Sequence, residues 1–224
     1  MVCWCPENAT KAYLQALKMG KRDNEPDVGE FISAIAAGNN AQLLVMACST
    51  MAVSTALALV AAAHQTGGHV VCILSSTGLN NNNGNIQASK KALGPHANCI
   101  EFVVGDAQKL LLMEEYKRAD FVLIDCNLDD HKSVFRAAKD CTSKQVGALI
   151  VGYNALHKRN ISWSHEFKTH FLPIGEGLLL TRTTAFAYGG GGKTSRWVVT
   201  VDKCTGEEHV FRITTSPPYK EIKA

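Results

Sequence analysis

Short apolar segments alternate with longer amphipathic ones through the middle of the chain, and this alternation limits the folds that are open to it. The short segments are almost continuously apolar, as buried strands are, and the longer ones have helical spacing. Strands joined by helices form a parallel sheet that is covered on both faces. Right-handed crossovers then predict a doubly wound, Rossmann-like α/β fold. The predicted strands of this core cover 42–47, 69–74, 99–104, 121–124 and 146–151.

Helices are predicted between these strands and before the first of them. Pro26 suits the first turn of a helix, and Gly38 ends the same segment. The predicted helices cover 6–18, 26–38, 52–64, 86–93, 107–116 and 131–141.

The pattern changes after Val151, where two pairs of short strands are each joined by a turn. The first pair is 171–173 with 178–181, and the second is 197–201 with 209–213. Both indicate antiparallel hairpins. We therefore predict one domain over 1–214, with an antiparallel end and an extra C-terminal hairpin. Its predicted parts are N-terminal helices (1–40), a parallel core (41–154) and antiparallel strands (168–214), with a flexible tail at 215–224.

The composition limits the classes of partner that we expect the chain to bind. The net charge of +3 is too small and too evenly spread to indicate nucleic-acid binding. The longest apolar run, 52–63, is too short to cross a bilayer, and the N-terminus has no secretory pattern. Four of the eight cysteines lie in or beside apolar strand-like runs and are expected to be reduced residues of the core. We expect a cytoplasmic protein, with the nucleus also open, that binds a small molecule and neither nucleic acid nor membrane; a homodimer stays open.

Several segments resemble known families. The order and spacing of 27–31, 43–57, 105–107, 121–125 and 172–177 are similar to those of plant caffeoyl-coenzyme-A-type O-methyltransferases. The similarity holds over about 26–183. Three further segments (4–13, 151–154 and 201–211) resemble the plant family known as domain of unknown function 1442. These resemblances imply a class I methyltransferase fold with S-adenosylmethionine as its cofactor.

The loop after the first strand departs from the methyltransferase pattern. By the resemblance, Met46 stands in place of the acid, and Cys48 and Ala52 stand in place of two glycines. Met46 brings no charge, while Cys48 and Ala52 add side chains where backbone should approach the ligand. Ser49 and Ser54 remain to meet a carboxylate or another anion. The loop therefore argues against S-adenosylmethionine, although the resemblance implies it.

The ends of the second and third strands offer further candidates for cofactor binding. Ser75 ends the second strand where the family holds the ribose with an acid, and a polar strand end is the alternative interpretation. Gly105, Asp106 and Ala107 follow the third strand, where the family meets the adenine. The alternative for Asp106 is that it caps the next helix.

Asp125, Tyr153 and Asn154 are the candidate catalytic residues. The resembled enzymes hold a divalent cation with two aspartates and an asparagine, but Tyr153 stands in place of the second aspartate. The family's lysine falls on Leu128. One carboxylate, one amide and one phenol are a poor ligand set for Mg²⁺ or Ca²⁺, so we predict no metal.

The same residues allow proton transfer, with His131 and His157 as further candidates. Three functions follow. The first is an S-adenosylmethionine-dependent methyltransferase-like protein with an eroded cofactor loop, acting on a small plant metabolite. The second is an acid/base isomerase or cyclase on the same fold, and the third is a non-catalytic binding or regulatory protein. We rank the first narrowly above the second.

Overall fold

The computed structural model describes residues 4–20, 28–50, 53–75, 82–142, 147–156, 169–183, 195–201 and 208–214. The chain divides into two compact units, Met1–Ala185 and Phe186–Ala224, and each is described by itself. The single domain over 1–214 stays a prediction. The expected tail at 215–224 lies outside the described residues, as do Ala52 and His157.

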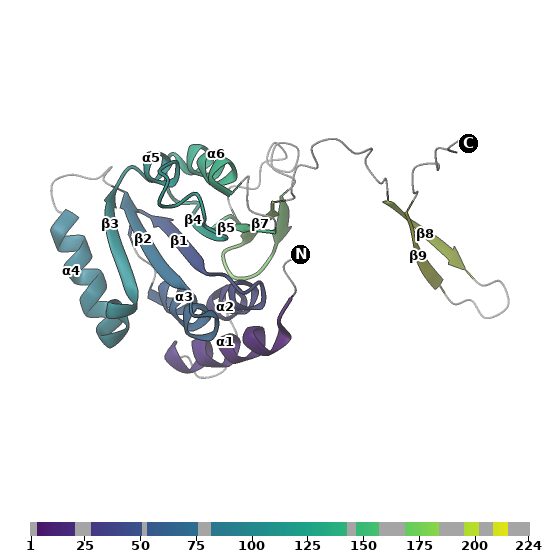
Figure 1. Ribbon diagram of the computed structural model, residues 1–224, viewed down its shortest axis with the longest axis horizontal. Helices are drawn as coiled ribbons and strands as arrows, with labels where there is room; N and C mark the ends of the chain where they lie inside the picture. The colour runs from purple at the N-terminus through teal and green to yellow at the C-terminus, as the bar shows by residue number, and fades with distance from the viewer. Residues whose placement is uncertain are drawn as a thin grey trace, which may run out of the picture. The chain divides into compact units, whose positions relative to one another are not determined.

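A seven-stranded sheet in the order β3-β2-β1-β4-β5-β7-β6 forms the centre of the first unit (Figure 1). The five strands from β3 to β5 are parallel, and β7 pairs antiparallel with both β5 and β6. This confirms the doubly wound sheet with an antiparallel end. The strands are β1 (Leu43–Cys48), β2 (His69–Ser75), β3 (Ile100–Gly105), β4 (Phe121–Asp125), β5 (Leu149–Tyr153), β6 (His170–Leu172) and β7 (Leu178–Arg182).

Helices cover both faces of this sheet. Figure 1 shows α1, α2 and α3 on one face and α5 and α6 on the other, with α4 beside β3. Successive residues of a strand point to opposite faces, so Met46 belongs to one core cluster and Ala47 to the other. The helices are α1 (Pro6–Met19), α2 (Val28–Gly38), α3 (Val53–Thr66), α4 (Asn82–Leu93), α5 (Ala107–Leu111) and α6 (His131–Thr142), with a 3₁₀ helix, η1 (Gly94–Cys99).

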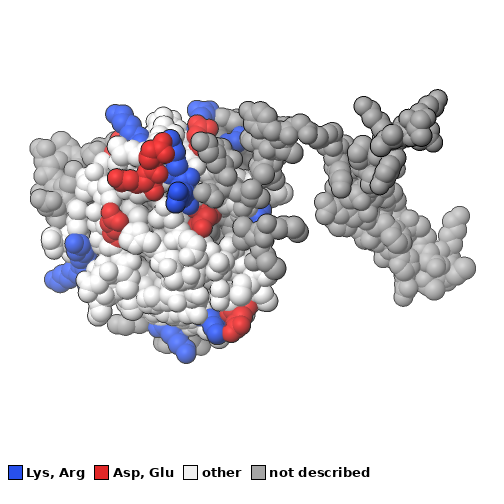
Figure 2. Space-filling model, viewed as in Figure 1, with Lys and Arg blue, Asp and Glu red and all other residues white. Residues whose placement is uncertain are grey.

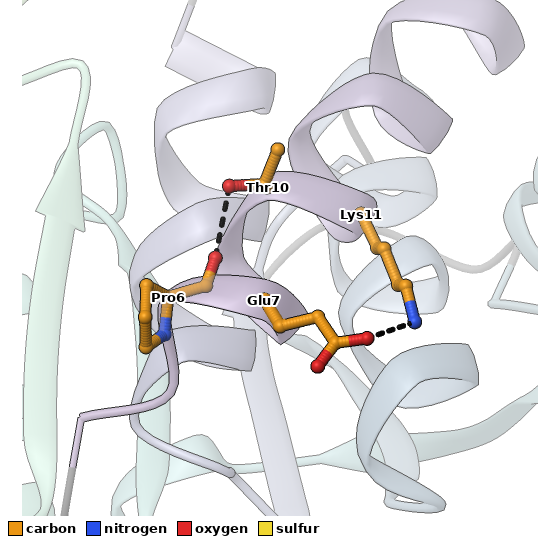
Figure 3. Close-up of polar contacts among 4 residues, drawn as sticks. All are labelled: Pro6, Glu7, Thr10 and Lys11. Carbon is orange, nitrogen blue, oxygen red and sulfur yellow. Dashed lines mark hydrogen bonds and ion pairs between the residues drawn. The ribbon is translucent and has the colours of Figure 1, made fainter.

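Local contacts mark the start of α1 (Figure 3). Thr10 donates a hydrogen bond from Oγ1 to the Pro6 carbonyl oxygen across 2.9 Å, and Lys11 Nζ pairs with Glu7 Oε1 at 2.6 Å. Proline suits this position because the first N–H groups of a helix have no partner within it. The Lys11–Glu7 pair is exposed and therefore adds little stability.

Helix α4 begins at Asn82 rather than at 86, and two further elements differ from their predicted bounds in ways that matter for the site. Helix α5 ends at Leu111 rather than at 116, and turns follow, in which the Tyr116 N–H donates to the Met113 carbonyl oxygen. Strand β5 covers Leu149–Tyr153 rather than 146–151, because its ladder partners are β4 and β7. The shift brings Tyr153 into the strand, opposite Asp125.

The second unit contains one antiparallel pair, β8 (Ser195–Val201) and β9 (Glu208–Thr214), which form their own two-stranded sheet. This confirms the extra C-terminal hairpin.

Charges of both signs lie close together on the face seen in Figure 2, next to a broad uncharged area. Among the described residues, no helix is long and apolar enough to pass through a membrane.

Candidate functional site

Asp125 and Tyr153 are adjacent at the carboxyl edge of the parallel sheet. They are register partners at the ends of β4 and β5. Asp125 is two residues after Leu123, and Tyr153 is two residues after Val151, so each belongs to the same sheet face as that earlier residue. Leu123 and Val151 both lie in the same core cluster. Asp125 and Tyr153 therefore lie on the sheet face that α1, α2 and α3 cover. The edge is the one at which open α/β sheets bind their ligands.

The Asp125 carboxylate is buried and accepts two hydrogen bonds. Its Oδ1 accepts from Asn154 Nδ2 and from the Asn127 backbone N–H, each across 2.9 Å. Only 4% of Asp125 is exposed. The Asn127 contact was missed by the sequence analysis, although an aspartate commonly accepts from the N–H two residues on.

Asn154 reaches Asp125 from an unusual backbone conformation. Its φ is +58°, a left-handed value that asparagine tolerates better than most residues. The chain on either side is held in place: the Cys126 N–H donates to the Tyr153 carbonyl oxygen, and the Ala155 N–H donates to that of Gly177. This pairing aims the Asn154 amide at the carboxylate.

The Tyr153 hydroxyl is buried without a hydrogen-bond partner among the described residues, and only 3% of the residue is exposed. Burial raises the pKa of the phenol far above its usual value, and the neighbouring Asp125 carboxylate raises it further. Tyr153 therefore stays protonated, and its O–H lies near the Asp125 carboxylate without forming a hydrogen bond of good geometry. Leaving such a donor unpaired costs about 1–3 kcal/mol.

Cys48 ends β1 with its side chain fully buried. Its Sγ lies 3.8 Å from Cys72 Sγ on β2. The contact with Cys72, together with burial, raises the pKa of the Cys48 thiol, so the group stays neutral. Met46, two residues earlier, is also buried and is the register partner of Cys72. Thiol and thioether groups thus fill the sheet face directly below the end of β1.

The serines predicted to bind cofactor flank the same edge. Ser49 follows β1 and is half-buried, and Ser54 lies exposed in the first turn of α3. Ser75 ends β2 opposite Gly105, its register partner at the end of β3.

Asp106 caps α5, which is the alternative to cofactor binding that the sequence left open. Its Oδ1 accepts from the N–H groups of Gln108 (3.0 Å) and Lys109 (3.3 Å), and its Oδ2 lies 3.4 Å from Lys109 Nζ. Burial acts to raise the pKa of Asp106, but the hydrogen bonds and charge of Lys109 outweigh it, so the pKa is lowered. Ala107, buried, is the first residue of the helix.

The residues at this edge do not fit a divalent cation. Asp125 is the one carboxylate among the three candidate catalytic residues, and Asn154 turns the nitrogen of its amide toward that carboxylate. No group of three or more His, Cys, Asp or Glu side chains arranged for a metal occurs in the described part of the chain. Leu128 is buried where the family's lysine would stand.

His131 begins α6 and is buried. Its Nδ1 lies 2.7 Å from the Leu128 carbonyl oxygen. Because a carbonyl oxygen only accepts, Nδ1 is the donor. The position of His157 is outside the described residues.

Comparisons with known proteins identify the family of the chain and proteins with a similar fold. A family model described as "Protein of unknown function (DUF1442)" matches residues 1–213. None of the curated proteins matches the chain.

Solved methyltransferases have a similar fold. The S-adenosylhomocysteine-bound methyltransferase PaMTH1 of Podospora anserina has a TM-score of 0.55 at 13% identity, covering 81% of this chain and 89% of its own. The O-methyltransferase TomG of Streptomyces achromogenes, in complex with S-adenosylmethionine, has a TM-score of 0.53 at 17% identity (83% and 93% covered). A candidate caffeoyl-CoA O-methyltransferase of Staphylococcus aureus has a TM-score of 0.54 at 16% identity (78% and 91%). At these low sequence identities the similarity shows a common fold and nothing about activity.

Proposed function

The chain belongs to the DUF1442 family, and we propose that it is a methyltransferase-like protein that binds a small molecule at the carboxyl edge of β4 and β5 and has an eroded S-adenosylmethionine loop. The substrate class that its resemblance suggests is a small plant metabolite. The proposal needs no divalent metal.

One observation carries this proposal: the Tyr153 hydroxyl is a buried donor without an acceptor among the described residues. It stands beside Asp125, whose carboxylate is held by Asn154 and Asn127. A bound molecule with an acceptor group would satisfy the hydroxyl, and buried polar groups are normally satisfied in native proteins. A small polar ligand is the partner that this edge fits.

The proposal that the cofactor loop is eroded depends mainly on Cys48. A glycine there would leave bare backbone for the methionine end of S-adenosylmethionine. Instead, a neutral thiol packs against Cys72, and buried Met46 brings no charge. These residues do not fit the methionine end of the cofactor, so we derive no methyl-transfer step. By the resemblance to the O-methyltransferases, Gly105, Asp106 and Ala107, at the end of β3 and the start of α5, are the residues that would meet an adenine.

Binding measurements test whether the bound small molecule carries an adenosyl group, as the resemblance to methyltransferases implies. Thermal unfolding and calorimetry should be followed with S-adenosylmethionine, S-adenosylhomocysteine and adenosine, each with and without Mg²⁺. A ligand at a hundred times its Kd stabilises a fold by about 2.7 kcal/mol. We expect the three compounds to raise the melting temperature by similar amounts, because binding depends on the adenine part that they share. Mg²⁺ should not change these shifts. If no compound shifts the melting temperature at millimolar concentration, adenosyl binding is wrong.

A second candidate, acid/base chemistry without a methyl donor, is favoured by the pairing of a protonated phenol with a buried carboxylate. Its test is a screen of small metabolites in D₂O, with deuterium incorporation read by mass spectrometry. An isomerase or cyclase of this kind would exchange a C–H proton, and Tyr153→Phe would abolish the exchange. Binding of a metabolite without any exchange would leave the third function, a non-catalytic binding protein.

A further inference from the structure

A thiol and an imidazole meet on the opposite edge of the sheet from the candidate site. Cys99 ends η1 directly before β3, and His64 lies in the last turn of α3. The two are 35 positions apart, yet Cys99 Sγ lies 3.7 Å from His64 Nε2. Both residues are exposed to solvent. A nucleophile within reach of a histidine that a third group orients is the arrangement of an activated nucleophile.

Two glutamines orient the imidazole. Gln65 donates from Nε2 to Gln15 Oε1 across 2.8 Å. The other end of the Gln15 amide, Nε2, lies 2.6 Å from His64 Nδ1, and an amide N–H can only donate. His64 therefore accepts at Nδ1, so a neutral ring carries its proton on Nε2, facing Cys99. The chain of contacts from Gln65 through Gln15 and His64 ends on the sulfur atom.

The other cysteines in the described part of the chain are less accessible. Cys48, Cys72, Cys126 and Cys141 are buried, and Cys5 is partly exposed. Burial also raises the pKa of Cys141 to about 11, which keeps that thiol protonated at neutral pH. Of these six thiols, Cys99 is the one that combines exposure with a histidine contact.

We propose that Cys99 is a site of covalent modification by low-molecular-weight disulfides, with His64 positioned to stabilise the attacking sulfur. The thiol of Cys99 releases its proton to water, and the Nε2–H of His64 donates to the resulting thiolate. That sulfur attacks one sulfur of the disulfide. A new S–S bond to Cys99 forms, the old S–S bond breaks, and the second half leaves as a thiolate. The disulfide is thereby reduced, and Cys99 is oxidised to a mixed disulfide.

The test uses the full chain and glutathione disulfide as the probe. The rate of modification of each cysteine is followed at neutral pH by peptide mapping and mass spectrometry. We expect Cys99 to react about fivefold or more faster than Cys5, and His64→Ala to remove this advantage. Gln15→Ala should give a partial loss, because the ring is then free to place its proton on Nδ1.

His69→Ala is the matched control. His69 is also an exposed histidine, but its Nε2 contacts Glu101 Oε2 at 2.8 Å. We expect this variant to leave the rate at Cys99 unchanged. Equal rates for the wild type and His64→Ala, or a rate at Cys99 no higher than at Cys5, would overturn the proposal. Circular dichroism of each variant shows that the fold is intact.

Discussion

The side-chain amide of Asn154 donates a hydrogen bond to Oδ1 of Asp125 across 2.9 Å, from a backbone with φ of +58°. Asn154 thus joins the end of β5 to the carboxylate that ends β4. The contact satisfies a buried acid at the carboxyl edge of the sheet, next to its register partner Tyr153.

Replacing Asn154 should destabilise the fold for two separable reasons. Asn154→Ala loses the hydrogen bond to Asp125 and places a less tolerant residue at positive φ, which together should cost about 2–4 kcal/mol of unfolding free energy. Asn154→Gly loses the hydrogen bond but relieves the strain, so it should cost about 1 kcal/mol less. Urea unfolding of both variants measures the difference. Equal losses would mean that the backbone conformation stores no strain.

Removing the Tyr153 hydroxyl should not weaken the free protein. Tyr153→Phe deletes a buried donor without an acceptor among the described residues, so the unfolding free energy should stay level or rise by about 1 kcal/mol. Urea unfolding in the absence of ligand is the measurement. A loss of more than about 1 kcal/mol would show that the hydroxyl is already satisfied in the free protein.

Gly177 should be sensitive to any added side chain. A Cβ there would lie 2.8 Å from the Leu156 backbone nitrogen and 2.9 Å from Phe171 Cε2, at a φ of +83°. Gly177→Ala should therefore cost about 2–4 kcal/mol.

Gly67→Ala is the control for this prediction, because its φ is +72° and nothing lies within 4 Å of a Cβ there. It should cost only the conformational strain, about 1–2 kcal/mol. Thermal or urea unfolding compares the two variants, and an equal loss at both positions would remove the steric explanation.

Asp120 should give stability an unusual pH dependence. Its carboxylate accepts from the N–H groups of Gln42 and Leu43 at the other edge of the sheet. Burial nevertheless raises the pKa of Asp120 above its ordinary value of 3.8, and these hydrogen bonds offset it only in part. Because the folded pKa is above the unfolded one, the folded state holds the proton more tightly. The stability contributed by Asp120 is therefore complete below the ordinary value and is lost as pH rises through the folded pKa.

Asp120→Asn removes this titration while keeping an oxygen acceptor. The unfolding free energy of the variant relative to the wild type should rise as pH increases from about 4 through the raised pKa of Asp120. Urea unfolding at several pH values measures this, with Asp129→Asn as a control for the removal of an exposed acid. If the unfolding free energy of Asp120→Asn relative to the wild type falls as pH rises, the raised pKa of Asp120 is contradicted.

The fold could be predicted from the sequence because its information is local. Buried strands such as Phe121–Asp125 are continuously apolar, the helices between them have their own period, and the crossover rule then leaves few topologies. The local pattern predicts an end for β5 that is two residues early, since the ladder with β4 and β7 sets where that strand stops. For this reason the local pattern predicts neither that Tyr153 lies in the strand nor that it pairs with Asp125.

Site chemistry was predictable where residues occupy strand ends. Asp125 is predicted because it ends an apolar strand at the ligand-binding edge, whereas Tyr153 and Asn154 follow from the resemblance to the O-methyltransferases. Their hydrogen bonds, and the role of Asp106 as a cap, depend on side-chain geometry that spacing does not contain.

The sequence by itself determined the alternation of strands and helices, and with it the edge where a ligand would bind. Only the tertiary structure decided which side chains meet there and elsewhere. Cys48 contacts Cys72, and His64 contacts both Cys99 and Gln15, across separations of 24 to 49 positions. The physical reason is that periodicity reports which face of an element is buried, whereas contacts between elements arise from packing and register.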